Sequence, residues 1–578
     1  MRGYTWTRFT LFDNFLKPLQ ILIIVIYVKK KNSKCYINRY NKCKFFFVIL
    51  KMLKSPFTAR KPQDFKILLF YPNLHMSALM PQSIGIFTAI LKQEGYTLDL
   101  FDCTYYQDID AINLGKNANQ ERVDNRNAPA FSTKELTDKG VKPKWGIKED
   151  FIKKVREFKP DLILGSVLES TYYLAMMLLE SVPIKDRKYK TLFGGVFATF
   201  AAEKIIKSDL VDYICRGEGE EAISEFCKKL CGGNFIHDVK NFTVKGNEQI
   251  FRNPLRPAVD INTVLIPDWD LFEEGSIYRP MQAKIWRAVG LETQRGCPYT
   301  CTYCNSPSNN VIYKNEVSKI FHRKKSIPRL KQELDFLVKK YNPELIYFVV
   351  DTFLAMSLKE FDEFKEMYSD YKIPFWMNTR AETITEHRAA GLEDMNMLRM
   401  NIGIEHGNFE YRKNYLKRPV SSELQIKAFE MVADKKYTTV ANSIIGMPDE
   451  NRDLIFDTIN LVRRLPKNIE ASGAFIFAPY HGTGLRELAI KKGYIKDEDI
   501  CSVSNTADES MLNMPTISKA EISGLNRTFS FYVKFPENRW DEIKVAENNN
   551  ESGNAMFKKL GMEFDKTYRN YSDNTDLH

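Results

Sequence analysis

The chain has 578 residues and a formal net charge of +11, with 44% hydrophobic and 27% charged residues. This length predicts several domains, and this composition is ordinary for chains that pack a hydrophobic core. Residues 1–60 hold thirteen Lys or Arg against a single acid, Asp13, so residues 61–578 carry a net charge of about −1. The charge of the main body of the protein therefore gives no footprint for nucleic acid.

The basic leader at residues 1–60 has no segment long enough to span a membrane. Its longest apolar run, Ile21–Val28, has eight residues, whereas a spanning helix needs about 20. Lys29–Lys31 follow where a signal peptide would need small cleavage-site residues, so secretion is not expected. In residues 29–51, seventeen of twenty-three are Phe, Ile, Lys, Asn or Tyr, the amino acids of AT-rich codons, so we expect translated upstream DNA with Met52 as the start. A basic anchor at a membrane surface is the alternative.

From residue 65 onward, short apolar strands alternate with helical stretches, a pattern typical of βαβ units with a parallel sheet. We therefore expect an open, doubly wound, Rossmann-like α/β domain at residues 61–239. A polar insertion rich in Asn and Lys interrupts it at residues 107–147. The expected elements are strands at Lys66–Tyr71, Thr97–Asp102, Asp161–Leu168, Thr191–Gly195 and Val211–Cys215, and a first helix at Gln82–Glu94.

Residues 240–289 combine a weak strand-like stretch with turn signals, and we expect them to link two domains. The second domain, at residues 290–484, shows six repeats of strand and helix, which predict a partial (β/α)6 barrel of the TIM type. A mostly helical extension is expected at residues 485–578. The expected barrel strands are Gly290–Gln294, Leu345–Val350, Pro374–Asn378, Met397–Gly403, Thr438–Ile445 and Glu470–Ala478.

A short loop after the first expected barrel strand carries Cys297, Cys301 and Cys304. The spacing C-x-x-x-C-x-x-C brings three thiolates together, so a cubic iron–sulfur cluster held there would keep one iron open for chemistry. A structural zinc site is the alternative, but such sites are closed by four ligands, commonly two C-x-x-C pairs, and the sequence has no second pair. Because these thiols must stay reduced to bind iron, we expect the protein in a reducing cytoplasm.

Polar residues follow each of the six expected barrel strands. Barrel enzymes place their chemistry at the carboxyl ends of the strands, so these residues predict one active site on that rim. They are Cys297 after the first strand, Asp351 after the second, Arg380 and Glu382 after the third, Glu405 after the fourth, Gly446 to Glu450 after the fifth, and Tyr480 with His481 after the sixth.

The cysteine segment Gln294–Asn305, with the sequence QRGCPYTCTYCN, resembles the signature of the radical SAM enzymes. Gly296 before the first cysteine and Tyr303 before the third are usual in that family. The resemblance implies a 4Fe-4S cluster whose unique iron binds the amino and carboxylate groups of S-adenosylmethionine.

Three further segments resemble motifs of the same family. The resemblance implies that Glu405 lies near the bound adenosylmethionine, that Gly446 lets backbone approach its adenine, and that Asp351 contacts its amino group or the substrate. Arg380, on the same rim, is expected to bind the cofactor as well. A surface turn, a turn that caps a helix and a helix N-cap remain open as the respective alternatives. The segments are Gly403–Gly407, Ile444–Glu450 and Phe348–Phe353.

Residues 65–235 resemble the cobalamin-binding domain that precedes the barrel in one large radical SAM subclass. Glycines at strand ends permit close approach of a bulky corrin, and the resemblance implies cobalamin binding by Gly194, Gly195, Gly217 and Glu218. A nucleotide-binding or degenerate domain is the alternative. The matching segments are Pro81–Leu91, Gly194–Thr199 and Arg216–Glu220.

His75 stands where cobalamin-dependent mutases carry a cobalt ligand within D-x-H-x-x-G. Here the segment is Asn73-Leu74-His75-Met76-Ser77-Ala78, with the Asp and the Gly both replaced. Loss of the aspartate removes the partner that would orient the imidazole, so we expect a loop histidine rather than a cobalt ligand.

The resemblance implies a cobalamin-dependent radical SAM enzyme, most simply a C-methyltransferase. In that reaction class a 5′-deoxyadenosyl radical takes a hydrogen atom from an unactivated carbon, and methylcobalamin then donates a methyl group. Ring closure or oxidative rearrangement without net methyl transfer is a rival outcome, and a non-catalytic cobalamin or cluster sensor is the alternative from another class. The expected partners are a small-molecule substrate and a flavodoxin- or ferredoxin-type electron donor, with neither nucleic acid nor stable membrane insertion.

Overall fold

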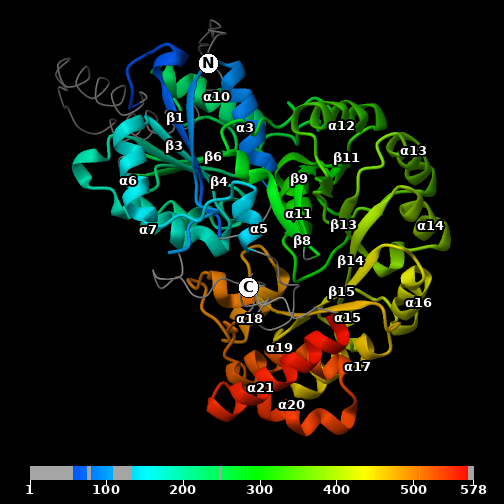
Figure 1. Cartoon of the computed structure of the whole chain (residues 1–578). Coiled ribbons are helices and arrows are strands. Elements are labelled where there is room, and N and C mark those ends of the chain that lie inside the picture. The colour runs from blue at the N-terminus through cyan, green and yellow to red at the C-terminus, as the bar shows by residue number, and fades with distance from the viewer. Residues whose placement is uncertain are drawn as a thin grey trace, which may run out of the picture. The chain divides into compact units, whose positions relative to one another are not determined.

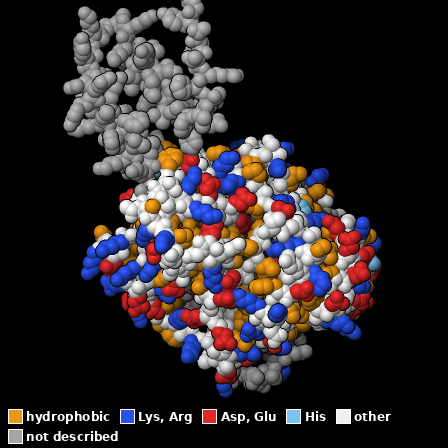
Figure 2. All heavy atoms as spheres, turned by 90° about the horizontal axis from the view of Figure 1, so that it is seen from above, with side chains coloured by type: hydrophobic (Ala, Val, Ile, Leu, Met, Phe, Trp, Pro, Cys, Tyr) orange, Lys and Arg blue, Asp and Glu red, His pale blue; other side chains and the backbone are white. Residues whose placement is uncertain are grey.

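The computed structural model describes residues 56–74, 80–108, 133–246, 249–282, 284–506 and 508–569, which all belong to one compact unit, Ser55–His578. Most of the leader, much of the polar insertion and His75 lie outside the described residues. In the described part of the chain no helix is long and apolar enough to cross a membrane. On the face shown in Figure 2, Lys and Arg intermix with Asp and Glu, in agreement with the near-neutral charge of residues 61–578.

The first sheet has the strand order β2-β1-β3-β4-β5-β6-β7, and β1 to β5 are parallel. Alternate residues of β1 enter separate cores: Leu68 and Phe70 pack toward α6 and α7, whereas Ile67 and Leu69 pack toward α3 and α10. A parallel strand covered on both faces reads as a continuous apolar run, as β1 does. The predicted doubly wound domain is therefore confirmed.

The elements of this domain have the following bounds. The strands are β1 (Lys66–Tyr71), β2 (Thr97–Asp102), β3 (Leu162–Ser166), β4 (Lys190–Gly194), β5 (Tyr213–Cys215), β6 (Phe242–Lys245) and β7 (Ile250–Arg252). The helices are α3 (Gln82–Gln93), α5 (Thr133–Asp138), α6 (Ile147–Phe158), α7 (Tyr172–Ser181), α8 (Val196–Phe200), α9 (Ala202–Ile205) and α10 (Glu220–Cys231).

The segment expected as a linker, residues 240–289, contributes strands to both sheets. β6 and β7 continue the first sheet antiparallel to β5, and β8 (Tyr278–Met281) pairs antiparallel with β9 (Lys284–Leu291) of the second sheet. Between them, the buried Trp269 donates its indole N–H to the Pro81 carbonyl at 3.1 Å. These short edge strands are partly exposed and carry little periodic signal, which is why the sequence pattern favours a linker. We propose domain boundaries at residues 61–239 for the first domain, 290–484 for the barrel and 485–578 for the C-terminal extension.

The second sheet places six parallel strands in chain order, β9-β12-β13-β14-β15-β16, with β8 outside β9. Helices lie along its outer side (Figure 1), and the sheet is an open row, as a partial barrel requires. Its remaining strands are β12 (Leu345–Phe348), β13 (Phe375–Arg380), β14 (Met397–Glu405), β15 (Thr438–Ile445) and β16 (Glu470–Ile476). The helices are α11 (Ser306–Val317), α12 (Ile327–Tyr341), α13 (Leu358–Tyr368), α14 (Glu386–Asp394), α15 (Phe409–Asn414), α16 (Ser422–Ala433) and α17 (Arg452–Arg463).

The C-terminal extension is helical, as predicted, and it covers the last barrel strand. Asn526 of α19 donates to the Ala474 carbonyl of β16 at 2.7 Å, and Ile522 joins the barrel core. Covering an edge strand in this way removes a surface on which other chains could pair. The extension contains α18 (Gly484–Lys491), α19 (Lys519–Lys534), α20 (Trp540–Ala546) and α21 (Glu551–Phe564), and Pro536 separates α19 from α20.

A buried acid–histidine pair joins the first domain to the loop after β16. The Glu169 carboxylate accepts the backbone N–H of His481 at 2.8 Å and lies 2.9 Å from its Nδ1. The backbone N–H of Cys501 donates to the same carboxylate at 3.0 Å. Burial alone would raise the pKa of Glu169, but the hydrogen bonds and charge of His481, with the bond from Cys501, leave that pKa below its ordinary value.

Glu169→Gln is expected to lower the free energy of unfolding by about 2 to 3 kcal/mol at neutral pH, because it removes a buried charged acceptor of hydrogen bonds from His481 and Cys501. The folded-state pKa of Glu169 lies below the unfolded value, so its stabilisation is present above the ordinary pKa of 4.5 and is lost as the pH falls through the folded value. The difference between parent and variant should therefore shrink in acid. Urea unfolding at several pH values measures it.

Glu203→Gln is the matched control, because Glu203 forms an exposed pair with Arg252 and should change stability little. If the difference in the free energy of unfolding between the parent and Glu169→Gln stays constant down to acid pH, the lowered pKa of Glu169 is contradicted.

Candidate functional site

A cavity of about 740 Å³ opens at the carboxyl ends of the barrel strands. Each of the six parallel strands, or the loop directly after it, contributes to its lining. The volume lies within the range of small-molecule sites. The cavity lining includes seven of the residues predicted from the sequence, namely Cys297, Cys301, Cys304, Asp351, Arg380, Glu405 and Tyr480, but not Glu382, Gly446 or His481.

The cysteine loop, residues 296–305, begins directly after β10 (Gln294–Arg295), which pairs with β11 (Arg323–Lys324). Gly296 has φ +80°, and an added Cβ would lie 2.8 Å from the Phe321 ring, so a glycine is required at this turn. The tight turn directs the chain into the cavity, where Cys297 and Cys301 are only 8% and 6% exposed.

Donors from the second and third barrel strands reach two of the sulfur atoms. Arg380 Nη1 donates to Cys301 Sγ at 2.9 Å, and its guanidinium lies 3.8 Å from the centroid of the Tyr299 ring. Thr352 Oγ1 lies 3.7 Å from Cys297 Sγ. Burial raises the pKa of the Cys297 thiol above its ordinary value, whereas the Thr352 contact acts to lower it.

Asp351 faces the third cysteine. The Ser306 hydroxyl donates to Asp351 Oδ2 at 2.5 Å, and the Ser306 backbone N–H donates to Cys304 Sγ at 3.4 Å. Burial, followed by the negative charge of Asp351, raises the pKa of the Cys304 thiol to about 12. The next helix, α13, is capped by Ser357, so the N-cap role considered for Asp351 is wrong.

The three thiols fit an iron–sulfur cluster. A cubic cluster binds each thiolate through a different iron and leaves the fourth iron open. Cys297, Cys301 and Cys304 lie on one loop and line one cavity, which matches this requirement.

Glu405 ends β14 in the left-handed region with φ +68°, directly after a register shift. Its Oε1 accepts from Arg418 Nη1 at 2.9 Å and from the Tyr303 hydroxyl at 3.0 Å. Such backbone strain in a residue other than glycine concentrates at functional sites. The alternative for this segment, a surface turn with glycines at positive φ, is wrong, because neither Gly403 nor Gly407 has a positive φ. The fully buried Arg418 was not predicted, because it lies in no motif.

Gly446 is placed outside the cavity lining, although its neighbour Ile444 belongs to that lining. It has φ +77°, and an added Cβ would meet Ile522 of α19 at 3.0 Å. The Gly446 and Met447 backbone N–H groups both donate to the Glu450 carboxylate. In this structure the missing side chain makes room for the C-terminal extension.

The carboxyl edge of the first sheet offers an apolar surface. Leu168, Tyr173 and Val196, which follow β3 and β4, are 50%, 42% and 40% exposed. Beside them, an added Cβ at Gly194 would meet nothing nearer than 3.9 Å, so a ligand can approach its backbone. At Gly195, which has φ +104°, an added Cβ would lie 2.7 Å from the Val167 carbonyl oxygen, so this glycine packs against protein. An apolar edge with one open glycine fits a flat corrin.

Gly217 and Glu218 are turned toward the barrel domain. An added Cβ at Gly217 would lie 2.5 Å from the Tyr313 hydroxyl of α11, and the Glu218 backbone N–H donates to that hydroxyl at 3.0 Å. The Glu218 carboxylate pairs with Arg295, two residues before Cys297. The resemblance predicts these two residues as cobalamin contacts, whereas in the structure they contact Tyr313 and Arg295 of the barrel domain.

Two family models match the chain: B12 binding domain over residues 81–227, and Radical SAM superfamily over residues 291–462. The uncharacterized methyltransferase PH0819 of Pyrococcus horikoshii is 24% identical over 395 residues, which cover 67% of this chain and 81% of that protein. The anaerobic magnesium-protoporphyrin IX monomethyl ester cyclase of Rubrivivax gelatinosus is 23% identical over 333 residues, 55% of this chain and 57% of the cyclase.

Two solved structures share the fold. The radical S-adenosylmethionine methyltransferase TsrM from Kitasatospora setae gives a TM-score of 0.53 at 13% identity, covering 86% of this chain and 95% of TsrM. The cobalamin-dependent radical enzyme OxsB gives 0.55 at 16% identity, covering 87% and 71%. With both domain models matched in this order, the chain belongs to the cobalamin-binding radical SAM enzyme family, whose cofactors are a 4Fe-4S cluster, S-adenosylmethionine and cobalamin.

Proposed function

We propose that this radical SAM enzyme methylates an unactivated carbon of a small molecule. The observation that carries the proposal is the cavity in which Cys297, Cys301 and Cys304 meet the polar ends of the second, third and fourth barrel strands. The similarity to a methyltransferase over 81% of its length supports methyl transfer as the outcome.

Different residues of the cavity would bind different parts of the cofactors. When bound, the cluster and cobalamin supply the electron that cleaves adenosylmethionine and the carrier for the methyl group. Cys297, Cys301 and Cys304 would hold the cluster. Glu405 would accept hydrogen bonds from ribose hydroxyls through Oε2, because its two bonds to protein side chains both use Oε1. Asp351 would accept a hydrogen bond from the amino group of adenosylmethionine.

The cavity wall formed by β12, β13 and β14 supports a neutral, polar group on the substrate. Asn378 donates to the Tyr347 hydroxyl at 3.0 Å, and Asn401 donates to Asn378 Oδ1 at 3.0 Å. Asn401 Oδ1 is buried with no hydrogen-bond partner among the described residues. A buried acceptor of this kind is costly unless a donor reaches it, so a ligand N–H or O–H is expected there.

The partner and location follow from the redox chemistry. We propose a flavodoxin- or ferredoxin-type electron donor and a cytoplasmic location, because the cluster thiols must stay reduced. All eight cysteines in the described ranges are free thiols, which supports this environment.

Adenosylmethionine labelled in its methyl group tests the proposal. The anaerobic enzyme, loaded with cluster and cobalamin and supplied with reductant and small-molecule extract, is expected to form 5′-deoxyadenosine and a labelled methylated product. The cyclase relatives favour a second candidate, ring closure without net methyl transfer, which predicts 5′-deoxyadenosine but no labelled product. A sensor would form neither compound.

A further inference from the structure

The segment Arg216–Glu220 follows β5 and contacts the barrel domain along most of its length. Arg216 Nη2 pairs with Glu316 of α11 at 2.6 Å, and both Gly217 and the Glu218 backbone contact Tyr313 of the same helix. α11 begins two residues after Cys304, the last ligand of the expected cluster. The segment predicted to contact cobalamin therefore packs against the helix that follows the cysteine loop.

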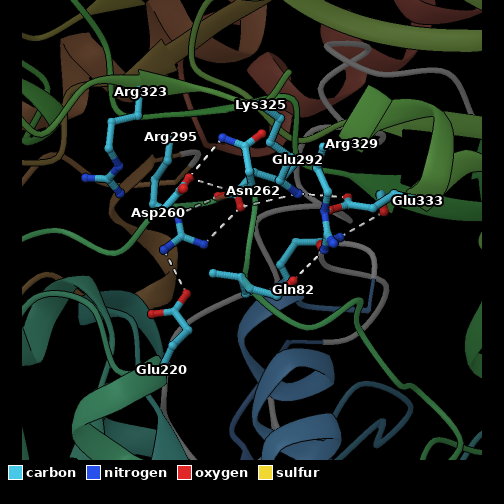
Figure 3. Close-up of polar contacts among 12 residues, drawn as sticks. Gln82, Glu220, Asp260, Asn262, Glu292, Arg295, Arg323, Lys325, Arg329 and Glu333 are labelled. Atoms are coloured by element: carbon cyan, nitrogen blue, oxygen red, sulfur yellow. Dashed lines mark hydrogen bonds and ion pairs between the residues drawn. The ribbon is translucent and has the colours of Figure 1, made fainter. Parts of the chain in front are cut away.

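Carboxylates from both domains hold Arg295, which lies two residues before Cys297. Arg295 Nη1 contacts Glu218 Oε1 at 2.6 Å and Glu220 Oε1 at 2.7 Å, while Nε and Nη2 both contact the Glu292 carboxylate at 2.9 Å. Figure 3 shows Arg295 between Glu292 and Glu220, whose helix belongs to the first domain. A planar guanidinium can serve several carboxylates in fixed directions, which a lysine cannot do.

The contact is largely buried and its charges balance. The side chains of Glu218, Glu220 and Arg295 are 5%, 10% and 15% exposed. In the wider cluster, four cationic side chains meet four carboxylates. The cations are Arg295, Arg323, Lys325 and Arg329, and the carboxylates are Glu218, Glu220, Glu292 and Glu333.

Both carboxylate oxygens of Glu218 are engaged by protein. Oε1 pairs with Arg295 and Arg323, and Oε2 accepts the Val259 backbone N–H at 2.8 Å. A cobalamin ligand would need an oxygen directed toward the cofactor. Because both oxygens already contact protein groups, the Glu218 carboxylate connects the two domains and does not face a cofactor.

We infer that Arg216–Glu220 is a docking clip that fixes the first domain on the cysteine loop, with Glu218 and Arg295 as positioning residues. Arg295 is the last residue of β10, and the cysteine loop begins directly after it. The position of the first domain against Arg295 therefore sets the position of Cys297. Two cofactors held by different domains need a fixed relative geometry to act on one substrate, and the clip provides it.

Glu218→Gln tests the clip through two readouts that need no turnover. Hydrogen–deuterium exchange of residues 294–305 is expected to become about tenfold faster or more, because a buried ionic contact is broken. The Kd for hydroxocobalamin is expected to stay within about twofold of the parent value. Glu225→Gln is the matched control, because Glu225 lies on α10, the helix that begins at Glu220, and pairs with Arg256 and not with the cysteine loop. Both readouts should match the parent.

The opposite pattern, unchanged loop exchange with a Kd weakened tenfold or more, would overturn the inference and make Glu218 a cofactor ligand. Two unchanged readouts would overturn it as well. If Glu218→Gln fails to fold, Arg295→Lys is tested instead, because lysine keeps the positive charge but loses the planar guanidinium. Hydrogen exchange of residues 294–305 should become faster in this variant as well. Unaltered exchange would overturn the inference. Absence of methyl transfer by the parent enzyme would defeat the proposed function but would leave both readouts standing.

Discussion

Cys301→Ala is expected to abolish the iron–sulfur cluster while the first domain still binds cobalamin. The parent protein, reconstituted without oxygen, should hold close to four iron and four sulfide per chain, because three thiolates suffice for a cluster with one open iron. The variant keeps two thiols and leaves the Arg380 guanidinium without the sulfur that it contacts at 2.9 Å. We expect its iron content to fall below about one per chain, with loss of the visible cluster absorbance.

Iron and sulfide analysis together with a hydroxocobalamin titration measures both halves of this prediction. Cys227→Ala is the control, because Cys227 is a buried thiol of α10 in the first domain and should not affect iron content. Full iron content in Cys301→Ala would contradict the ligand assignment. Simultaneous loss of cobalamin binding would show that the two domains do not fold independently.

Glu405→Gln is expected to weaken adenosylmethionine binding about tenfold to a hundredfold, with the cluster retained. Hydrogen bonds to a charged acceptor contribute about 1.5 to 3 kcal/mol, and each 1.4 kcal/mol corresponds to about tenfold in Kd. The amide also leaves the buried Arg418 without the negative charge that it contacts at 2.9 Å. Equilibrium dialysis of labelled adenosylmethionine against cluster-loaded protein measures the change.

Glu430→Gln, on the exposed face of α16, provides the comparison and should bind adenosylmethionine like the parent. An unaltered Kd in Glu405→Gln would remove Glu405 from the adenosylmethionine site. Loss of iron in that variant would instead mean that Glu405, through its bond with Tyr303, supports the cysteine loop.

The central strands could be predicted from the sequence because they are short apolar runs bounded by turn residues. Lys66–Tyr71, Thr97–Asp102 and Thr438–Ile445 have the expected bounds. The first barrel strand was expected at Gly290–Gln294 but is β9, Lys284–Leu291. Its first half pairs with β8 at the sheet edge and is partly exposed, so polar residues there hide the strand signal.

The candidate site was predictable only where a residue lies at the carboxyl end of a strand or a few residues after it. Asp351, Arg380 and Glu405 meet in the cavity because parallel strands bring their carboxyl ends to one edge. Arg418 reaches the cavity from a connection after β14, and only tertiary packing brings it there. The glycines show the same limit: Gly446 makes room for Ile522, a contact that no local pattern contains.

The central claim is that the three cysteines of the cavity hold a cluster whose open iron binds adenosylmethionine. Electron paramagnetic resonance of the reduced, anaerobically reconstituted protein tests it directly. Adding adenosylmethionine is predicted to shift the cluster g values in the parent protein, because the ligand binds the open iron. An unchanged spectrum at saturating adenosylmethionine, or zinc in place of iron and sulfide, would contradict the account.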